Sequence, residues 1–172
     1  MDLNRWIFLL NQKIYALKFS MNIDNFTNIK LVTAEQIRTL RHKMLRQDKD
    51  FSTTAYDKDN EQDTFHLGAY KEDKVISCAT FYPENTKKIK SNKAYRLRGM
   101  ATDSDYFRKG FGAKIMHQAY KILNSRDCDL LWCNARLVAL KFYKSVGMCE
   151  IGDIFNIPDI GAHYYMYKRI SK

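Results

Sequence analysis

Arg108-Lys109-Gly110-Phe111-Gly112-Ala113 lies between a strand-like segment and a helix-like one. Two glycines let the backbone approach a ligand closely, and free N–H groups at a helix start favour an anion. Arg108 and Lys109 add full positive charges beside those groups. The stretch has neither the Lys-Ser/Thr pair of a Walker A loop nor the complete dinucleotide fingerprint. Taken by itself, it is equally well a diphosphate site or a glycine-rich turn with exposed basic residues.

Strand and helix patterns intermix on both sides of this stretch. Strands are indicated by period-2 alternation, and helices by apolar residues at i, i+3 and i+4. The expected strands cover residues 28–32, 64–70, 75–82, 94–102, 130–133, 148–155 and 164–170, and the expected helices cover residues 34–47, 112–123 and 137–146. No internal repeat occurs. The chain is therefore predicted to form one α/β (α+β) domain around a mixed sheet.

Single residues mark several boundaries in this pattern. Thr33 and Gln36 have the spacing of a capping box at the start of the first helix. Gly147 follows the last helix as its C′ residue. Within residues 94–102, apolar and basic side chains alternate only as far as Gly99. A glycine at such a break predicts a bulge or a close backbone approach.

Composition and charge narrow the classes of partner. The 172 residues are 45% apolar and include 10 Phe, 11 Tyr and 2 Trp, which is enough to build a core. Lys and Arg number 29 against 19 Asp and Glu, giving a formal net charge of +10. This charge favours a nucleic acid, an acidic membrane or a phosphorylated small molecule as partner. No apolar run approaches the roughly 18 residues of a membrane span.

Residues 1–20 form a predicted N-terminal extension, and residues 21–172 form the predicted domain. The run Trp6-Ile7-Phe8-Leu9-Leu10 is too short for a secretory signal, but the segment fits a short amphipathic helix. Such a helix packs on its own domain or on a partner subunit, or it touches a membrane surface weakly. Met21 is an alternative start of the chain.

The cysteines show no metal-binding or disulfide spacing. Cys78, Cys128, Cys133 and Cys149 form no C-x-x-C pair and have no nearby histidine partner. No metal site is therefore predicted. Scattered cysteines in a chain of this length are typical of reduced thiols in a cytoplasmic protein.

Further motifs accompany the glycine-rich stretch in a fixed order. Leu97-Arg98-Gly99-Met100-Ala101-Thr102 precedes it, while Leu131-Trp132-Cys133-Asn134-Ala135-Arg136 and Ala139-Leu140-Lys141-Phe142-Tyr143-Lys144-Ser145-Val146-Gly147-Met148 follow it. With this set, the chain from about residue 28 onward resembles the GNAT superfamily of N-acetyltransferases. Phe107 stands where that family has Gln or Arg, and Arg108 follows it directly. The resemblance implies a single GNAT-like domain, in which helices flank a mixed central sheet with splayed central strands.

The same resemblance implies acetyl-CoA as co-substrate and a set of residues that bind it. Met100, Ala101 and Thr102 match the strand that lines the pantetheine arm. The pyrophosphate would rest on the backbone of residues 108–113. Asn134 matches a position that hydrogen-bonds the cofactor, and it is also a candidate cap for the next helix.

Chemical roles follow from the resemblance as well. Backbone N–H near Met100 is the implied donor to the oxyanion, and Tyr143 matches the general acid that protonates the CoA thiolate. The alternative for Tyr143 is packing beside Phe142 on an apolar helix face. His66 and His163 are candidates for a general base, acting directly or through water, and each is also readable as a hydrogen-bonded structural residue.

Two segments are predicted to wall the acceptor, residues 48–63 and residues 155–164. The first carries acids that either attract a cationic amine or are merely solvated, namely Asp57, Asp59, Glu61 and Asp63. The acceptor is expected to be a small-molecule or peptide amine, and the sequence does not identify it.

The leading hypothesis is an N-acetyltransferase that moves an acetyl group from acetyl-CoA to a primary amine by direct attack. A second hypothesis is a nucleic-acid-binding module, based on the cluster of Lys87, Lys88, Lys90, Lys93, Tyr95, Arg96 and Arg98. A third is an acyl-CoA sensor without catalysis. Dimers are common in the family, so a homodimer is one assembly that the resemblance implies.

Overall fold

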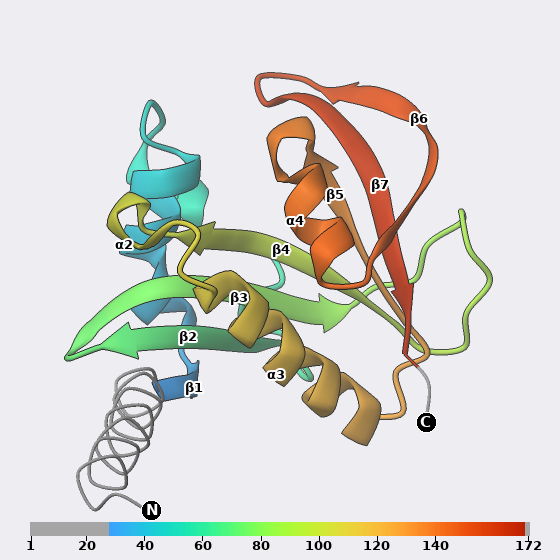
Figure 1. The fold of residues 1–172 in the computed structure, drawn as a ribbon, viewed down its shortest axis with the longest axis horizontal. Helices are drawn as coiled ribbons and strands as arrows, with labels where there is room; N and C mark the ends of the chain where they lie inside the picture. The colour runs from blue at the N-terminus through green and yellow to red at the C-terminus, as the bar shows by residue number, and fades with distance from the viewer. Residues whose placement is uncertain (1–27, 171–172) are drawn as a thin grey trace, which may run out of the picture.

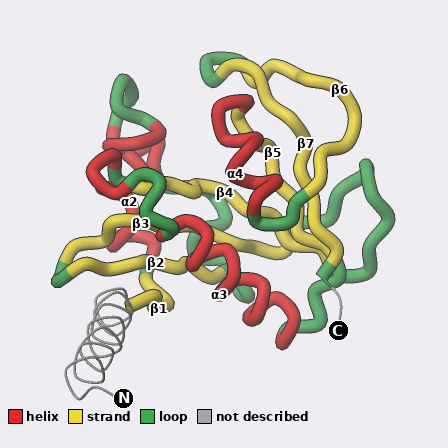
Figure 2. Tube along the Cα trace, viewed as in Figure 1, coloured by secondary structure: helices red, strands yellow, loops and turns green. Residues whose placement is uncertain are grey.

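The protein's computed structural model describes residues 28–170. One sheet of seven strands runs through it in the order β1-β2-β3-β4-β5-β7-β6 (Figures 1 and 2). The strands are β1 (Asn28–Val32), β2 (Phe65–Lys71), β3 (Lys74–Pro83), β4 (Ala94–Thr102), β5 (Leu130–Arg136), β6 (Cys149–Ile157) and β7 (Gly161–Arg169). The helices are α2 (Ala34–Leu45), α3 (Phe111–Ser125) and α4 (Leu140–Ser145), with 3-10 turns η1 (Phe51–Thr54), η2 (Ser104–Tyr106) and η3 (Leu137–Ala139). The predicted extension at residues 1–20 lies outside the described residues.

The sheet opens between its two central strands. β4 and β5 run parallel and pair only from Ala94, opposite Leu130, to Arg96, opposite Trp132. Beyond Arg96 the two strands separate, as Figure 1 shows, and β5 continues alongside β7. The edge of β4 that faces β5 is therefore left without a strand partner from Leu97 onward. The predicted splay of the central strands is confirmed.

Gly99 sits at a bulge on β4, as the sequence predicts. The pairing of β3 with β4 shifts register between Cys78 and Thr80, which is where Gly99 lies on the opposing strand. Its φ is +59°, in the left-handed region that favours glycine. A Cβ atom there would lie 2.8 Å from Nε of Arg41 and 2.9 Å from Cε2 of Tyr56. The bulge is thus packed closely from the α2 side.

The two long helices cover opposite faces of the sheet. α3 packs on one face through a core that includes Leu67, Phe81 and Leu97. α2 packs on the other face, with Ile37 and Leu40 against Cys78 and Ala101 of β3 and β4. The apolar spacings that predict these helices are therefore the ones that bury them.

Local boundaries follow the sequence patterns closely in several places. The Gln36 side chain accepts a hydrogen bond from the Thr33 N–H at 2.8 Å, as the capping-box spacing predicts. Gly147 adopts a φ of +82° directly after the last helix, the conformation expected of a C′ residue. Between β2 and β3 the hairpin turn is shorter than the predicted residues 71–74, because Lys71 pairs with Lys74.

The C-terminal third contains more strand than the sequence predicts. The prediction that β5 ends at residue 133 is wrong, because Asn134 pairs with Tyr165 and Arg136 with His163. The predicted loop at residues 155–164 is also wrong: β6 and β7 remain paired as far as Ile157, opposite Gly161. Long-range pairing overrides local propensity at both places. Asn134 is accordingly a strand residue, and Arg136 occupies the N-cap position of the following 3-10 turn.

Gly99→Ala is expected to lower the free energy of unfolding by about 2–4 kcal/mol. An alanine pays for the left-handed φ, and its Cβ also collides with Arg41 and Tyr56. Gly110→Ala is the matched control, because Gly110 also has a positive φ but a Cβ there meets nothing within 4 Å. That variant should lose only about 1 kcal/mol in urea unfolding. Equal losses in the two variants would contradict the close packing beneath the bulge.

Candidate active site

A cleft of about 480 Å³ lies where β4 and β5 separate. It brings together several residues that the sequence singles out, namely Met100, Ala101, Thr102, Asn134, Tyr143 and His163. Its other walls come from the end of α2, from Tyr56 after η1, and from Ile157 and Ile160 near the β6–β7 turn. Both segments predicted to wall the acceptor therefore contribute to the cleft.

The start of α3 is an open cradle. Gly110 is the N-cap residue with a φ of +81°, and nothing lies within 4 Å of a Cβ built on it. The N–H groups of Phe111, Gly112 and Ala113 precede the first hydrogen bond inside the helix and have no acceptor among residues 28–170. Arg108 is exposed beside them. Free donors, open space and positive charge together fit the diphosphate of CoA.

Lys109 is partly engaged in its own loop. Its Nζ donates to the carbonyl oxygen of Asp105 at 2.8 Å and lies 5.2 Å from the ring centroid of Tyr106. It therefore adds charge to the cradle from a fixed position. A Cβ on Gly112 would lie 3.2 Å from both Cε of Met100 and the ring of Phe142, so the cradle joins β4 to α4 directly.

Tyr143 lies on α4 and is only 7% exposed at the wall of the cleft. Burial, followed by the neighbouring Cys133 thiol, raises the pKa of Tyr143 well above 10. Its phenol therefore keeps its proton near neutral pH. Burial also raises the pKa of Cys133 to about 12, so this cysteine is a neutral thiol and not a nucleophile.

His163 has one ring nitrogen committed and one available. Nδ1 lies 2.7 Å from the carbonyl oxygen of Gly161, and a carbonyl can only accept, so Nδ1 carries the proton. Nε2 then holds a free lone pair, and no described residue is hydrogen-bonded to it. The ring is 3% exposed, lines the cleft and lies beside Phe155. This arrangement leaves a basic nitrogen available in the cleft.

Comparison with known proteins identifies the family to which the chain belongs. The sequence pattern of the acetyltransferase (GNAT) family matches residues 31–148. The chain belongs to the GNAT family. It is 34% identical over 142 residues to the uncharacterized N-acetyltransferase YitI of Bacillus subtilis (strain 168), covering 83% of this chain and 95% of that one. The chain is therefore an N-acetyltransferase homologue with acetyl-CoA as its co-substrate.

Solved GNAT structures share the fold at low sequence identity. An aminoglycoside 6'-N-acetyltransferase complexed with coenzyme A superposes with a TM-score of 0.67 at 11% identity, over 84% of this chain and 98% of that one. The ribosomal-protein-S18-alanine N-acetyltransferase of Escherichia coli superposes with a TM-score of 0.64 at 18% identity, over 85% and 95%.

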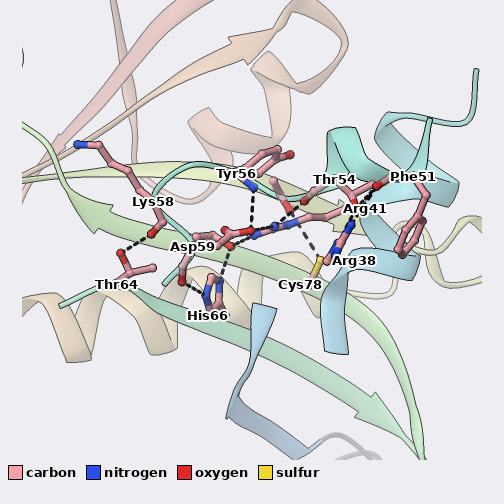
Figure 3. A network of polar contacts seen from close by, with 12 residues as sticks. Arg38, Arg41, Phe51, Thr54, Tyr56, Lys58, Asp59, Thr64, His66 and Cys78 are labelled. Atoms are coloured by element: carbon pink, nitrogen blue, oxygen red, sulfur yellow. Dashed lines mark hydrogen bonds and ion pairs between the residues drawn. The ribbon is translucent and has the colours of Figure 1, made fainter. Parts of the chain in front are cut away.

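His66, the other histidine named from the sequence, lies outside the GNAT cleft. Nε2 donates to the carbonyl oxygen of Asp59 at 2.9 Å, and Nδ1 lies 2.7 Å from the Thr80 hydroxyl (Figure 3). The side chain is buried on β2, and burial lowers the pKa of His66 below 6.5. Because both ring nitrogens of His66 are hydrogen-bonded, this neutral side chain fits a structural role.

Arg41 is the residue of the site region that sequence reasoning missed. It is fully buried, and its guanidinium binds both carboxylate oxygens of Asp59 at 2.6 and 3.0 Å (Figure 3). It also donates to the Thr54 carbonyl at 2.9 Å and to the Thr80 hydroxyl. The idea that Asp59 attracts a cationic amine is wrong, because its charge is already paired. The available signal was the position of Arg41 on the same helix side as Ile37 and Leu40.

The basic cluster proposed for nucleic-acid stacking is divided by the fold. Tyr95 is fully buried in the core beside α3, so its ring cannot stack on a base. Arg96 pairs with Glu84 at 2.8 Å, and Arg98 lies over the ring of Tyr56 in the cleft. Within residues 28–170, no helix is long and apolar enough to cross a membrane. Nor does that part of the chain gather three or more potential metal ligands.

The stability of the protein should fall on acidification through the range in which His66 titrates. Above pH 6.5 the ring is neutral in both states. Below pH 6.5, the His66 ring takes up a proton in the unfolded chain, whereas in the folded chain the buried ring binds a proton weakly. The free energy of unfolding should therefore drop by up to about 1.4 kcal/mol per pH unit toward the folded-state pKa. His66→Gln should flatten this slope in urea titrations between about pH 7 and pH 5. Identical slopes in the two proteins would contradict the assignment.

Proposed function

We propose that the protein transfers an acetyl group from acetyl-CoA to a primary amine by direct attack in a ternary complex. The observation that carries this proposal is the opening between β4 and β5. The unpaired edge of β4 and Tyr143 line one cleft, and so does Phe107, three residues before the α3 cradle begins at Gly110. No covalent enzyme intermediate is needed, because the amine is itself the nucleophile.

The chain's own groups account for binding of the co-substrate. Met100, Ala101 and Thr102 offer backbone groups on the side of β4 that β5 has left. The pantetheine arm, an extended chain of amides, would pair with this edge as a strand does. The pyrophosphate would lie on residues 108–113, and Asn134 would donate to the arm from β5.

Two groups would then serve the chemistry at the thioester. The Met100 N–H would donate to the acetyl oxygen as negative charge develops there. Met100 follows the bulge, and no described pair joins it to β3. As the C–N bond forms and the C–S bond breaks, the Tyr143 phenol would give its proton to the departing sulfur. Its raised pKa keeps the phenol protonated at neutral pH, so a proton is present when the thiolate appears.

His163 is our candidate for the base that removes the amine proton, directly or through one water. Its Nε2 lone pair is available in the cleft, whereas both nitrogens of His66 are occupied. The Nδ1–H···O bond to Gly161 fixes the tautomer that this role requires. We therefore assign His66 a structural role.

The cellular setting follows from the cysteines. Cys78, Cys128, Cys133 and Cys149 are all free thiols, and the first three are buried. We propose a cytoplasmic location on that basis. The homodimer stays a prediction from the family resemblance.

Tyr143→Phe should lower kcat by about 10²- to 10⁴-fold. The change removes only a hydroxyl, so the KM for acetyl-CoA and the free energy of unfolding should stay close to wild type. Tyr167→Phe is the matched control, because Tyr167 packs among the side chains around Trp132 and Tyr165, outside the cleft. The rate of thiol release from acetyl-CoA gives kcat for both variants. A Tyr143→Phe enzyme with wild-type kcat would remove the proposed acid, and acetyl-CoA binding without turnover in wild type would favour the sensor hypothesis.

His163→Gln should lower kcat/KM for the amine by about 10²-fold. The glutamine can still hydrogen-bond but cannot take a proton. Thiol release with acetyl-CoA saturating measures the change. If the variant keeps the wild-type kcat/KM, the base is another group or water alone.

A further inference from the structure

The charged residues that line the cleft are all basic. Among residues 28–170, four arginines and one histidine line it, and no aspartate or glutamate does. The arginines are Arg46, Arg96, Arg98 and Arg136. These arginines would repel a cationic amine that carries no anionic group.

These arginines lie on the sheet face opposite the α3 cradle. On β4, Tyr95 and Leu97 pack into the core with α3, so Arg96 and Arg98 between and beyond them face the α2 side. On β5, Cys133 and Ala135 join the same core, which places Arg136 on the α2 side as well. The Nη2 of Arg136 indeed reaches the carbonyl oxygen of Leu45 on α2 at 3.4 Å. The cluster is therefore separate from the cradle that suits the diphosphate.

Most of this charge has no carboxylate partner. Arg96 pairs with Glu84, but within residues 28–170 no ion pair involves Arg46, Arg98 or Arg136. The Arg98 guanidinium lies 4.3 Å from the ring centroid of Tyr56, which fixes its plane. All three unpaired arginines are half-buried. Arg98 and Arg136 are held by the Tyr56 ring and the Leu45 carbonyl without a counter-charge, an arrangement that suits an anion.

We propose that the acceptor is a primary amine that also carries a carboxylate or phosphate, and that Arg98 and Arg136 bind this anionic group. The inference rests on the proposed acetyl transfer. Arg98 lies two residues before Met100 on β4, on the other side of the Gly99 bulge. Both residues line the cleft, so a small acceptor would have its amine at Met100 and its anionic group at Arg98 within one cavity. Polyamines and aminoglycosides, which are cationic, do not fit this lining.

Matched amine pairs test the substrate class. β-Alanine against β-alaninamide tests the carboxylate, phosphoethanolamine against ethanolamine tests the phosphate, and spermidine represents a cation. With acetyl-CoA saturating, kcat/KM from thiol release should be about ten-fold or more higher for at least one anionic member than for its neutral partner. The amine pair that shows this difference in kcat/KM identifies whether the site prefers a carboxylate or a phosphate. Equal or better turnover of the neutral and cationic amines would overturn the proposal.

Charge variants assign the preference to the cleft. Arg98→Gln should remove most of the anionic preference while leaving the KM for acetyl-CoA unchanged, and Arg98→Lys should restore part of it. Arg136→Gln provides a second variant on a different strand. Lys87→Gln is the control, because Lys87 is exposed on the β3–β4 connection and makes no described contact with the cleft. A loss of the same size in Lys87→Gln would mean that only long-range attraction is at work.

Binding of succinate, compared with succinamide, gives a readout that needs no turnover. With CoA saturating, succinate should bind about ten-fold or more tightly, and Arg98→Gln should abolish the difference. If no amine is acetylated but this binding difference holds, the acetyl-transfer proposal fails while the anion site stands. If acetyl transfer occurs, but neither succinate over succinamide nor any anionic amine over its neutral partner is preferred, the anion site fails alone.

Discussion

The buried guanidinium of Arg41 joins the parts of the chain that build the cleft. It extends from α2 to the Asp59 carboxylate, to the Thr80 hydroxyl on β3 and to the Thr54 carbonyl in η1. It also lies under the bulge at Gly99, where a Cβ would be 2.8 Å from its Nε. Removing one partner from a buried ion pair costs about 3–5 kcal/mol. The course of β4 after Leu97, and with it the edge offered to the co-substrate, therefore depends on a charge buried on the other side of the sheet.

The open sheet divides two kinds of anion recognition between its faces. On the α3 side, backbone N–H groups at a helix start and a few exposed basic side chains suit a diphosphate. On the α2 side, recognition would rest on guanidinium groups held by a tyrosine ring and a backbone carbonyl. Six of the chain's 29 Lys and Arg residues lie at these two places, namely Arg108 and Lys109 at the cradle and Arg46, Arg96, Arg98 and Arg136 in the cleft. In the proposed reaction, the acetyl group would lie in the gap between the two.

Sequence reasoning predicted the fold where local patterns and packing agree. The apolar spacing of α3, the break at Gly99 and the motif order around Tyr143 all specify elements that the structure contains. The predictions failed where pairing with residues far away in the sequence determines the secondary structure. Nothing local in Asn134-Ala135-Arg136 indicates a strand, yet β7 pairs with all three residues. Likewise Asp59 looks like one acid among several until α2 brings Arg41 against it.

The unpaired N–H groups at the start of α3 carry a thermodynamic consequence for the cell. Donors without an acceptor among residues 28–170 are satisfied by water or by a bound anion, so a co-substrate that bound them would stabilise the folded chain and not the unfolded one. A ligand at a hundred times its dissociation constant adds about 2.7 kcal/mol to the free energy of unfolding. Domains of this size are stable by only about 5–15 kcal/mol. If the diphosphate binds at this cradle, the stability of the folded chain would rise with the supply of acetyl-CoA.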